Sequence, residues 1–269
     1  MPRAALLCAI LIGHSALARA DEPARRGGPT PTATDGDGVT SEVAATASLA
    51  RGVTDRTLVT ARGIVAAEYD GWGGFVQPSW VFGQVNGKRS DNELFVRVLG
   101  FHAFADRWFA FAVGVGEHSL HRKIDERAFG GAGVGITALR EPAARLLVSV
   151  GVVDEVTWFA SPLLADGTVL ANDRRQTVRA VARLYGRYVL PGAGVVLTHD
   201  LYVMPSVSAR SDLRAIAYVA LDVPIHGGLA GRVVVDASYE QRIVEGTEHD
   251  DLAVTFGLSY AFRSRREAD

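Results

Sequence analysis

The sequence of 269 residues predicts an all-β protein, a transmembrane antiparallel up-and-down β-barrel of about 12 strands, with 10 as the alternative count. Three observations predict this class. The chain begins with an export signal, and segments of alternating apolar and polar residues then follow one another to its end. No stretch reaches the roughly 20 apolar residues that a membrane-spanning helix needs. A chain of this kind could cross a membrane only as a closed barrel.

The first twenty residues, "MPRAALLCAILIGHSALARA", predict a signal peptide. They combine Arg3, an apolar run over residues 4–12 and the small-residue triplet at 18–20, so cleavage is expected before Asp21. The alternative, an N-terminal membrane helix, requires a longer apolar run. The single cysteine, Cys8, lies inside this segment, so no disulfide is expected in the mature chain.

Residues 21–40, "DEPARRGGPTPTATDGDGVT", show no hydrophobic period and are expected to form a disordered periplasmic linker. The whole sequence has 28 Lys and Arg against 30 Asp and Glu. This balance gives no indication of nucleic-acid binding.

The barrel itself is expected over residues 41–262, because alternating segments separated by turn-forming residues fill this range. None of them shows a helical period. The expected strands are residues 41–51, 56–69, 74–84, 93–104, 107–118, 127–138, 145–157, 176–188, 194–205, 213–223, 230–243 and 251–262.

The lengths of the connections predict which end of the barrel each one occupies. After the first, "GVTD", they alternate between short ("DGWGG", "ADR", "REPAA", "LPGAG", "IHGG") and longer ("QVNGKRSD", "SLHRKIDER", "FASPLLADGTVLANDRR", "SVSARSD", "VEGTEHD"). Outer-membrane barrels have tight periplasmic turns and longer extracellular loops. Both ends of the barrel domain are therefore expected on the periplasmic side.

One face of each strand is apolar, and in a membrane barrel that face contacts lipid. The residues expected on it include Phe109, Phe111, Val113, Val115, Val233, Val235, Phe256 and Leu258. The alternative is a soluble periplasmic β-barrel that binds an apolar ligand, in which the same residues converge on the interior. Aromatic residues at segment ends favour the membrane barrel because they match interfacial girdles: Tyr69, Trp72, Phe104, Trp108, Tyr185, Tyr188, Tyr260 and Phe262 beside short turns, and Trp158 with Phe159 at the longest loop.

Five stretches, "RGVTDRTLVTARGIVAAEY", "GFHAFADRWFAFAVGVGE", "GGAGVGITAL", "LYVMPSV" and "VTFGLSYAF", resemble in order and spacing the salt-induced outer-membrane protein family, a bacterial family whose domain has no assigned function. The resemblance covers about residues 41–262. It implies an outer-membrane barrel of a Gram-negative envelope, with outer-membrane lipid and the barrel assembly machinery as partners. Tyr260 and Phe262 are the expected assembly signal, although a charged tail, residues 263–269, follows them.

The opposite face of the strands is expected to line the lumen. Strands five to seven would supply a wall of small residues: Gly114, Gly116, Gly131, Gly133, Gly135, Ser149 and Gly151. Strand eight places arginines at a spacing of four, which keeps them on one face. The candidate lumen-lining residues are Arg179, Arg183, Arg187, Glu155, Asp200, Asp222, Asp236 and Glu240.

Two functions remain open for such a lumen. The charges could select small charged or zwitterionic solutes in a narrow channel, or the arginines could fold against the acids and plug a structural barrel. No catalytic residues, cofactor or metal are expected. His199 and Asp200 are neighbours in one strand and so point to opposite faces. The chain is therefore predicted not to be an enzyme.

Overall fold

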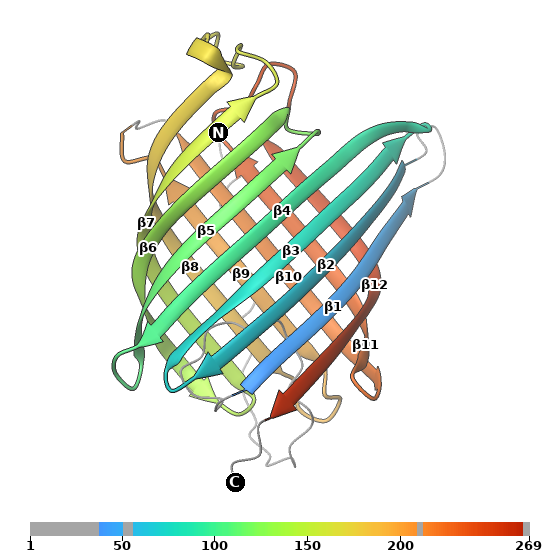
Figure 1. The fold of residues 1–269 in the computed structure, drawn as a ribbon. Helices are drawn as coiled ribbons and strands as arrows, with labels where there is room; N and C mark the ends of the chain where they lie inside the picture. Colours follow the sequence, from blue (N-terminus) through green and yellow to red (C-terminus); the bar gives the residue numbers. More distant parts are fainter. Residues whose placement is uncertain (1–37, 51–55, 209–211, 266–269) are drawn as a thin grey trace.

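The computed structural model describes residues 38–50, 56–208 and 212–265, which form one closed antiparallel barrel of twelve strands (Figure 1). Each strand pairs with its neighbours in chain order. The strands are β1 (Gly38–Ala50), β2 (Arg56–Tyr69), β3 (Trp72–Val85), β4 (Lys88–Ala103), β5 (Trp108–Ser119), β6 (Ile124–Glu141), β7 (Ala144–Phe159), β8 (Arg174–Val189), β9 (Val196–Pro205), β10 (Leu213–His226), β11 (Leu229–Glu240) and β12 (Asp250–Arg265).

The barrel closes because β1 pairs with both β2 and β12. The seam with β12 runs from Gly38 opposite Arg265 to Ala47 opposite Phe256. The last strand is therefore hydrogen-bonded along both edges, to β1 and to β11. This confirms the barrel of twelve strands and rules out the count of ten.

The domain bounds differ slightly from those expected. The expected signal peptide (1–20), most of the linker and the end of the tail lie outside the described residues. Strand β1 begins at Gly38, inside the expected linker, and β12 continues to Arg265, inside the expected charged tail.

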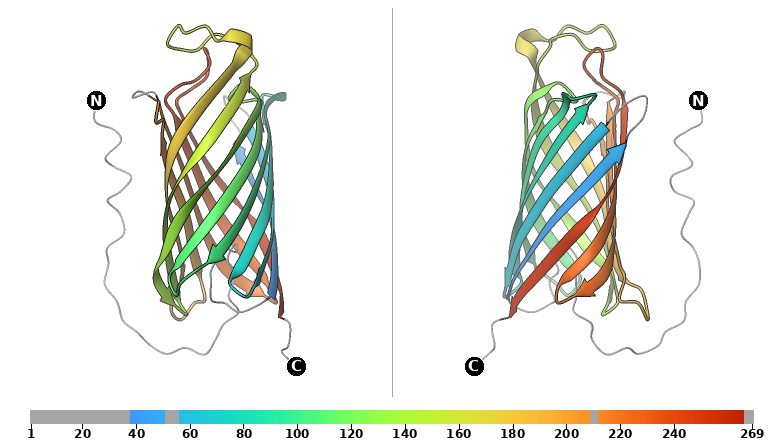
Figure 2. Two further views of the ribbon diagram at one scale, coloured as in Figure 1. Left: turned by 60° about the vertical axis from the view of Figure 1, so that its left-hand side comes forward. Right: turned by 90° about the vertical axis from the view of Figure 1, so that its right-hand side faces the viewer.

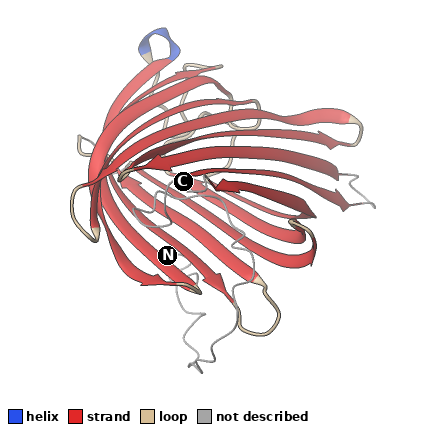
Figure 3. Cartoon of the chain, turned by 60° about the horizontal axis from the view of Figure 1, so that its bottom comes forward, coloured by secondary structure: helices blue, strands red, loops and turns tan. Residues whose placement is uncertain are grey.

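The start of β1 and the end of β12 lie at the same end of the barrel (Figure 2), which we call the chain-end rim. The turns at this rim are residues 70–71, 104–107, 142–143, 190–195 and 227–228. Longer connections, including residues 160–173 and 241–249, lie at the opposite end, the loop rim. Strands make up the whole wall, and the one short helix of the described residues, the 3-10 helix η1 (Ala171–Asp173), lies in the connection from β7 to β8 (Figure 3).

Two connections at the loop rim are shorter than expected. Residues 86 and 87 alone join β3 to β4, and residues 120–123 join β5 to β6. Asn86 and Gly87 both have positive φ, 50° and 75°, as in a two-residue hairpin turn, and Asn-Gly is a favoured pair for such a turn. The expected alternation of short and longer connections is thus wrong for this half of the loop rim, where polar strand residues resembled loops.

The outer face of the barrel is largely apolar and the inner face carries the charges. On β12, Phe256 and Leu258 are 61% and 51% exposed, whereas Thr255 and Ser259 are buried. Val233 and Val235 on β11 alternate with the buried Arg232 and Val234, which places both on the outer face. These four positions agree with the expected orientation.

Strand β5 is oriented opposite to the expectation. Phe109 is buried inside the barrel, where it packs with Phe111 and Val113, while Gly114 and Gly116 lie on the outer face. The predictions that Phe109, Phe111, Val113 and Val115 contact lipid and that Gly114 and Gly116 line the lumen are therefore wrong. The cause is an interior that is apolar on this side, so both faces of the strand are apolar or small and alternation alone does not distinguish them.

Most of the exposed aromatic side chains lie near the two rims. Tyr69, Trp72, Phe104, Trp108 and Tyr260 are exposed near the chain-end rim, and Trp158 and Tyr239 are exposed near the loop rim. Two residues from the expected girdles lie elsewhere, since Tyr185 faces the interior and Phe159 is buried under the loops. In the described part of the chain, no helix is long and apolar enough to cross a membrane.

Candidate functional site

The barrel interior contains three levels between the chain-end rim and the loop rim. An apolar cluster lies toward the chain-end rim, a group of buried ion pairs lies toward the loop rim, and a cavity of about 320 Å³ borders both. Because inward residues alternate with lipid-facing or solvent-facing ones along every strand, each level collects side chains from several strands.

The apolar cluster, which we call the apolar floor, consists of Ile64, Phe75, Leu99, Phe101, Phe109, Leu147 and Tyr185. Glycines on β6 make room for its aromatic rings. A Cβ atom at Gly133 would lie 2.7 Å from Cζ of Phe111, and one at Gly135 would meet the ring of Phe109. The expected small-residue wall is therefore present at Gly131, Gly133, Gly135, Ser149 and Gly151, and its members Gly133 and Gly135 accommodate aromatic rings.

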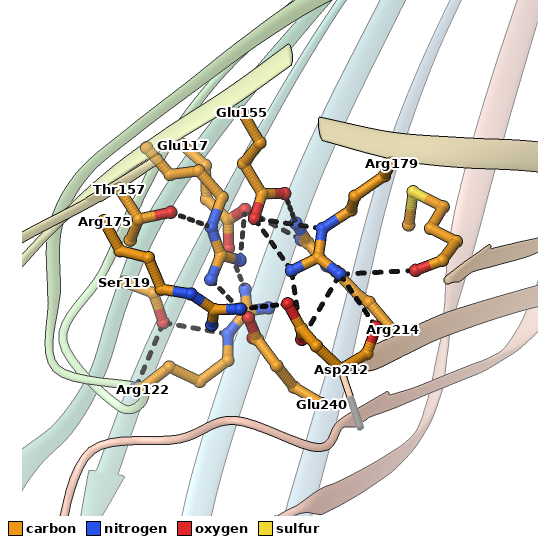
Figure 4. A network of polar contacts seen from close by, with 12 residues as sticks. Glu117, Ser119, Arg122, Glu155, Thr157, Arg175, Arg179, Asp212, Arg214 and Glu240 are labelled. Carbon is orange, nitrogen blue, oxygen red and sulfur yellow. Dashed lines mark hydrogen bonds and ion pairs between the residues drawn. The ribbon is translucent and has the colours of Figure 1, made fainter. Parts of the chain in front are cut away.

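The ion pairs near the loop rim form a continuous group, which we call the ionic layer (Figure 4). It contains equal numbers of positive and negative side chains: Arg122, Arg127, Arg175, Arg179 and Arg214 with Glu93, Glu117, Glu155, Asp212 and Glu240. Its formal charge is zero.

The ionic layer crosses the lumen. Arg127 on β6 donates to Glu240 on β11 at 2.5 Å, and these strands lie on nearly opposite sides of the barrel. Arg214 on β10 likewise reaches Glu117 on β5 at 3.0 Å. Arg127 has no exposed surface and Arg214 only 2%. The two bridges therefore span the lumen at this level.

Further hydrogen bonds fix these arginines in place. Arg179, which is fully buried, donates to Glu155 at 3.1 Å and to the backbone oxygens of Met204 and Asp212. Three further hydrogen bonds run from Arg127 to Thr157 at 3.0 Å, from Arg214 to Glu155 at 3.1 Å, and from Arg175 to Asp212. A buried ion group of this kind is retained only when its donors and acceptors are satisfied in this way.

Arg122, in the turn between β5 and β6, completes the layer at the loop rim. It contacts Glu117 and lies 3.9 Å from Glu93. Burial alone would lower the pKa of this guanidinium, but the two carboxylates raise its pKa above the ordinary value.

Loops cover the ionic layer on one side. Leu164 of the β7–β8 connection bridges to Val244 of the β11–β12 connection, and both are almost fully buried with Ile124 and Phe159. The amide of Ala165 also donates to the carbonyl of Ile243, at 2.9 Å. The two longest connections thus meet above the lumen and pack as one unit.

The cavity below the ionic layer holds a second charged group, which we call the central cluster: Arg97, Arg183, Asp200 and Tyr202. Arg183 donates from Nε to Asp200 at 2.6 Å. Arg97, across the barrel on β4, reaches Asp200 at 3.4 Å and Gln77 at 2.5 Å. The guanidinium of Arg183 also stacks over the rings of Tyr185 and Tyr202.

A third charged group lies near β1. Arg232 donates to Asp222 at 2.6 Å and pairs with Glu42 at 2.5 Å, and Ser259 donates to Asp222. Nearby, Arg62 lies 3.7 Å from Asp236.

The structure brings most candidate lumen residues into these groups. Glu155, Arg179 and Glu240 belong to the ionic layer, Arg183 and Asp200 to the central cluster, and Asp222 and Asp236 to the group near β1. Arg187 lies opposite Thr198 and Arg145 in register, nearer to the chain-end rim. Of the two expected assembly residues, Tyr260 is exposed on the outer face, while Phe262 pairs through its backbone with Ser41.

Sequence reasoning missed several members of these groups: Arg62, Glu93, Arg97, Glu117, Arg122, Arg127, Arg175, Asp212, Arg214 and Arg232. A signal for Arg127 was present, because it shares its strand face with the inward glycines of β6. Glu117 was missed because the expected orientation of β5 placed its side chain on the outer face. Within the described residues, no group of three or more His, Cys, Asp or Glu side chains is placed to hold a metal ion.

Solved structures with a similar barrel include porins and autotransporter domains. The NanC porin is 12% identical, with a TM-score of 0.48 over 82% of this chain and 98% of that one. The translocator domain of the autotransporter NalP from Neisseria meningitidis is 13% identical (TM-score 0.44, 85% and 90% covered), and the KdgM porin is 10% identical (TM-score 0.42, 83% and 99% covered). Likeness at this level carries no inference about transport.

No curated protein shows significant sequence similarity to the chain. A family-wide sequence profile, described as "Protein of unknown function, DUF481", matches residues 43–262, which is nearly the whole barrel. The chain therefore belongs to this family of proteins of unknown function.

Proposed function

We propose that this protein is an outer-membrane β-barrel of a Gram-negative envelope, non-enzymatic, whose lumen is closed at rest by its own side chains. The observation that carries the proposal is the neutral, buried ionic layer that crosses the lumen through Arg127 and Arg214. Export would depend on the signal peptide, residues 1–20.

The outer face supports a location in a membrane. Large apolar side chains such as Val43, Val65, Phe256 and Leu258 are about half exposed or more, in a barrel whose charges are turned inward. A soluble barrel that binds an apolar ligand would have the opposite arrangement. The aromatic residues near both rims fit the two interfaces of a bilayer.

This location implies two partners. Outer-membrane lipid would contact the apolar outer face, and the barrel assembly machinery would recognise the aromatic residues Tyr260 and Phe262 near the end of β12.

Closure at rest fits the size of the barrel. Barrels of eight strands are filled by side chains, whereas those of sixteen or more leave an aqueous channel. With twelve strands, long arginine and glutamate side chains from opposite walls are long enough to meet, as Arg127 and Glu240 do.

Cell fractionation tests the proposed location. The protein should be recovered with outer membranes, and its gel mobility should change on boiling, as expected for a closed barrel. Recovery in the soluble periplasmic fraction, with the same mobility before and after boiling, would refute the membrane location.

A second candidate function is a narrow channel for small charged or zwitterionic solutes. The observation that favours it is the central cavity with its charged lining. Planar-bilayer recordings of the wild type and Arg183→Glu distinguish the two: a channel should conduct and change its ion selectivity with the variant, whereas silence in both supports the closed barrel.

A further inference from the structure

The central cavity has the dimensions of a ligand site. Its volume of about 320 Å³ is at the lower end of the range for small-molecule sites, roughly 300–1,000 Å³. The apolar floor bounds it toward the chain-end rim, and the ionic layer borders it toward the loop rim on the side of β5 and β10.

The central cluster in this cavity carries an excess of positive charge. Arg97 and Arg183 both pair with Asp200, which among the described residues is the only carboxylate that pairs with either of them. The three side chains are at most 14% exposed. A buried charge without a partner is costly, so this cluster would be stabilised by one additional negative charge.

The excess is local, because the other interior groups are balanced differently. The ionic layer is neutral, and Arg232 near β1 pairs with two carboxylates, Glu42 and Asp222. The positive excess therefore identifies one part of the cavity, beside Asp200, as a place for an anion.

Two polar groups of the cavity lining also lack partners. Within the part of the chain that the structure describes, neither Nε of Arg97 nor the hydroxyl of Thr198 has a hydrogen-bond partner, although both atoms are buried. Thr198 is 6% exposed and lies two residues before Asp200, on the same inward face of β9. Buried polar atoms are normally satisfied, so these two donors indicate a missing polar partner.

Apolar and aromatic side chains surround this charged spot. The guanidinium of Arg97 lies 5.2 Å from the ring centre of Phe75, and that of Arg183 lies 5.4 Å from the ring centre of Tyr185. Both rings belong to the apolar floor, and Leu99 and Phe109 of the same floor line the cavity. The site thus combines a cationic spot with an apolar surface.

We propose that this cavity binds a small organic acid, with its carboxylate held by Arg97 and Arg183 and its apolar body against the floor. The inference rests on the closed barrel of the proposed function, since a lumen closed by the ionic layer retains a solute that an open one would release.

Binding of radiolabelled benzoate, measured by equilibrium dialysis, tests this inference. The full mature chain is folded from urea into detergent with the probe present, so that entry into a closed cavity does not limit binding. Benzamide and benzylamine serve as neutral and cationic competitors of nearly the same shape. Benzoate should bind saturably, and neither competitor should displace it.

Three variants give results that a merely structural role would not produce. Arg97→Gln should weaken benzoate binding by about tenfold or more, as expected for the loss of a charged hydrogen bond. Asp200→Asn should strengthen it, because both arginines lose their only carboxylate. Thr198→Val, which removes an unpartnered hydroxyl and so should fold normally, should weaken binding by a smaller factor.

The control is Arg174→Gln, at an exposed arginine that stacks on Trp158 near the loop rim, and its affinity should match the wild type. No saturable binding by a correctly folded wild type, or equal affinity for benzoate and benzamide, would overturn the inference. A silent barrel that binds no benzoate would leave the proposed function intact. A barrel that conducts steadily would refute that function instead.

Discussion

At the scale of single residues, Arg127 is the side chain on which the proposed closure of the lumen most depends. It joins β6 to Glu240 across the barrel and to Glu117 and Thr157 beside it, without any exposed surface. Arg127→Met would leave two buried carboxylates without this partner. The free energy of unfolding, measured by reversible urea titration in detergent, should fall by about 3–5 kcal/mol.

The matched control for Arg127→Met is Arg174→Met. Arg174 is exposed, and its loss should lower the free energy of unfolding by less than about 1 kcal/mol. Equal losses in the two variants would mean that the ionic layer contributes no more than a surface charge does.

Glycines of the inner wall provide a second test at this scale. A Cβ atom at Gly133 would lie 2.7 Å from both Cα of Gly151 and Cζ of Phe111, whereas one at Gly114 on the outer face meets nothing within 4 Å. Gly133→Ala should therefore lower the free energy of unfolding by about 1–3 kcal/mol. Gly114→Ala should leave it unchanged or raise it slightly, because alanine restricts the unfolded chain. The same urea titrations measure both, and a stable Gly133→Ala variant would show that the neighbouring backbone of β7 and the ring of Phe111 move aside.

At the scale of strands and loops, the sequence predicts the strands themselves better than it predicts which face of each strand points inward. The number, order and approximate bounds of the strands follow from alternation and turn residues, and the structure confirms the count. Orientation fails at β5 because Phe109 and Phe111 face an apolar floor while alanine and glycine face outward. A strand that lies between two apolar surroundings has no polar face to orient it.

Loop lengths fail for a related reason. Residues 88–92, "KRSDN", are polar because they continue β4 at the loop rim, yet in the sequence they resemble a loop. The Asn86–Gly87 pair was the better indicator, since it fixes a two-residue turn whatever the polarity around it.

The candidate site could be predicted only in part. Alternation places Arg179 and Arg183 on the inner face of β8. Acidic residues on the same face of neighbouring strands are then the expected partners for ion pairs with these arginines. It does not give the pairing across the lumen, because Arg127 with Glu240 and Arg97 with Asp200 join strands that are far apart in chain order. Such pairs depend on barrel closure and on the diameter, which no single strand encodes.

The two longest loops should behave as one unit, which Val244→Asp tests. Val244 is 1% exposed against Leu164, and a buried aspartate there would separate the loops. Trypsin should then cleave after Arg242 several times faster than in the wild type, while the heat-modifiable band of the folded barrel is retained. The control variant Val207→Asp changes a 65% exposed position between β9 and β10. Trypsin should cleave this variant after Arg242 at the wild-type rate. Equal rates in both variants would contradict the joined loops.

At the scale of the whole molecule, the barrel has an apolar outside, a charged layer at one end of its interior and an apolar floor toward the other. The loops that meet above the ionic layer lie at the end opposite to both described chain ends. In the closed barrel that we propose, a solute would cross this interior only after the cross-lumen bridges separate. The proposed closed state thus combines the shape of a pore with a lumen that is crossed by its own side chains.

Planar-bilayer conductance of the wild type and of the double variant Arg127→Ala/Arg214→Ala tests this closure most directly, after both are shown to be folded by gel mobility before and after boiling. The double variant removes both bridges that cross the lumen in the ionic layer. The wild type should give no steady current steps, and the double variant should give discrete ones. A wild-type barrel that conducts steadily, with steps as large as those of the variant, would contradict closure by the ionic layer.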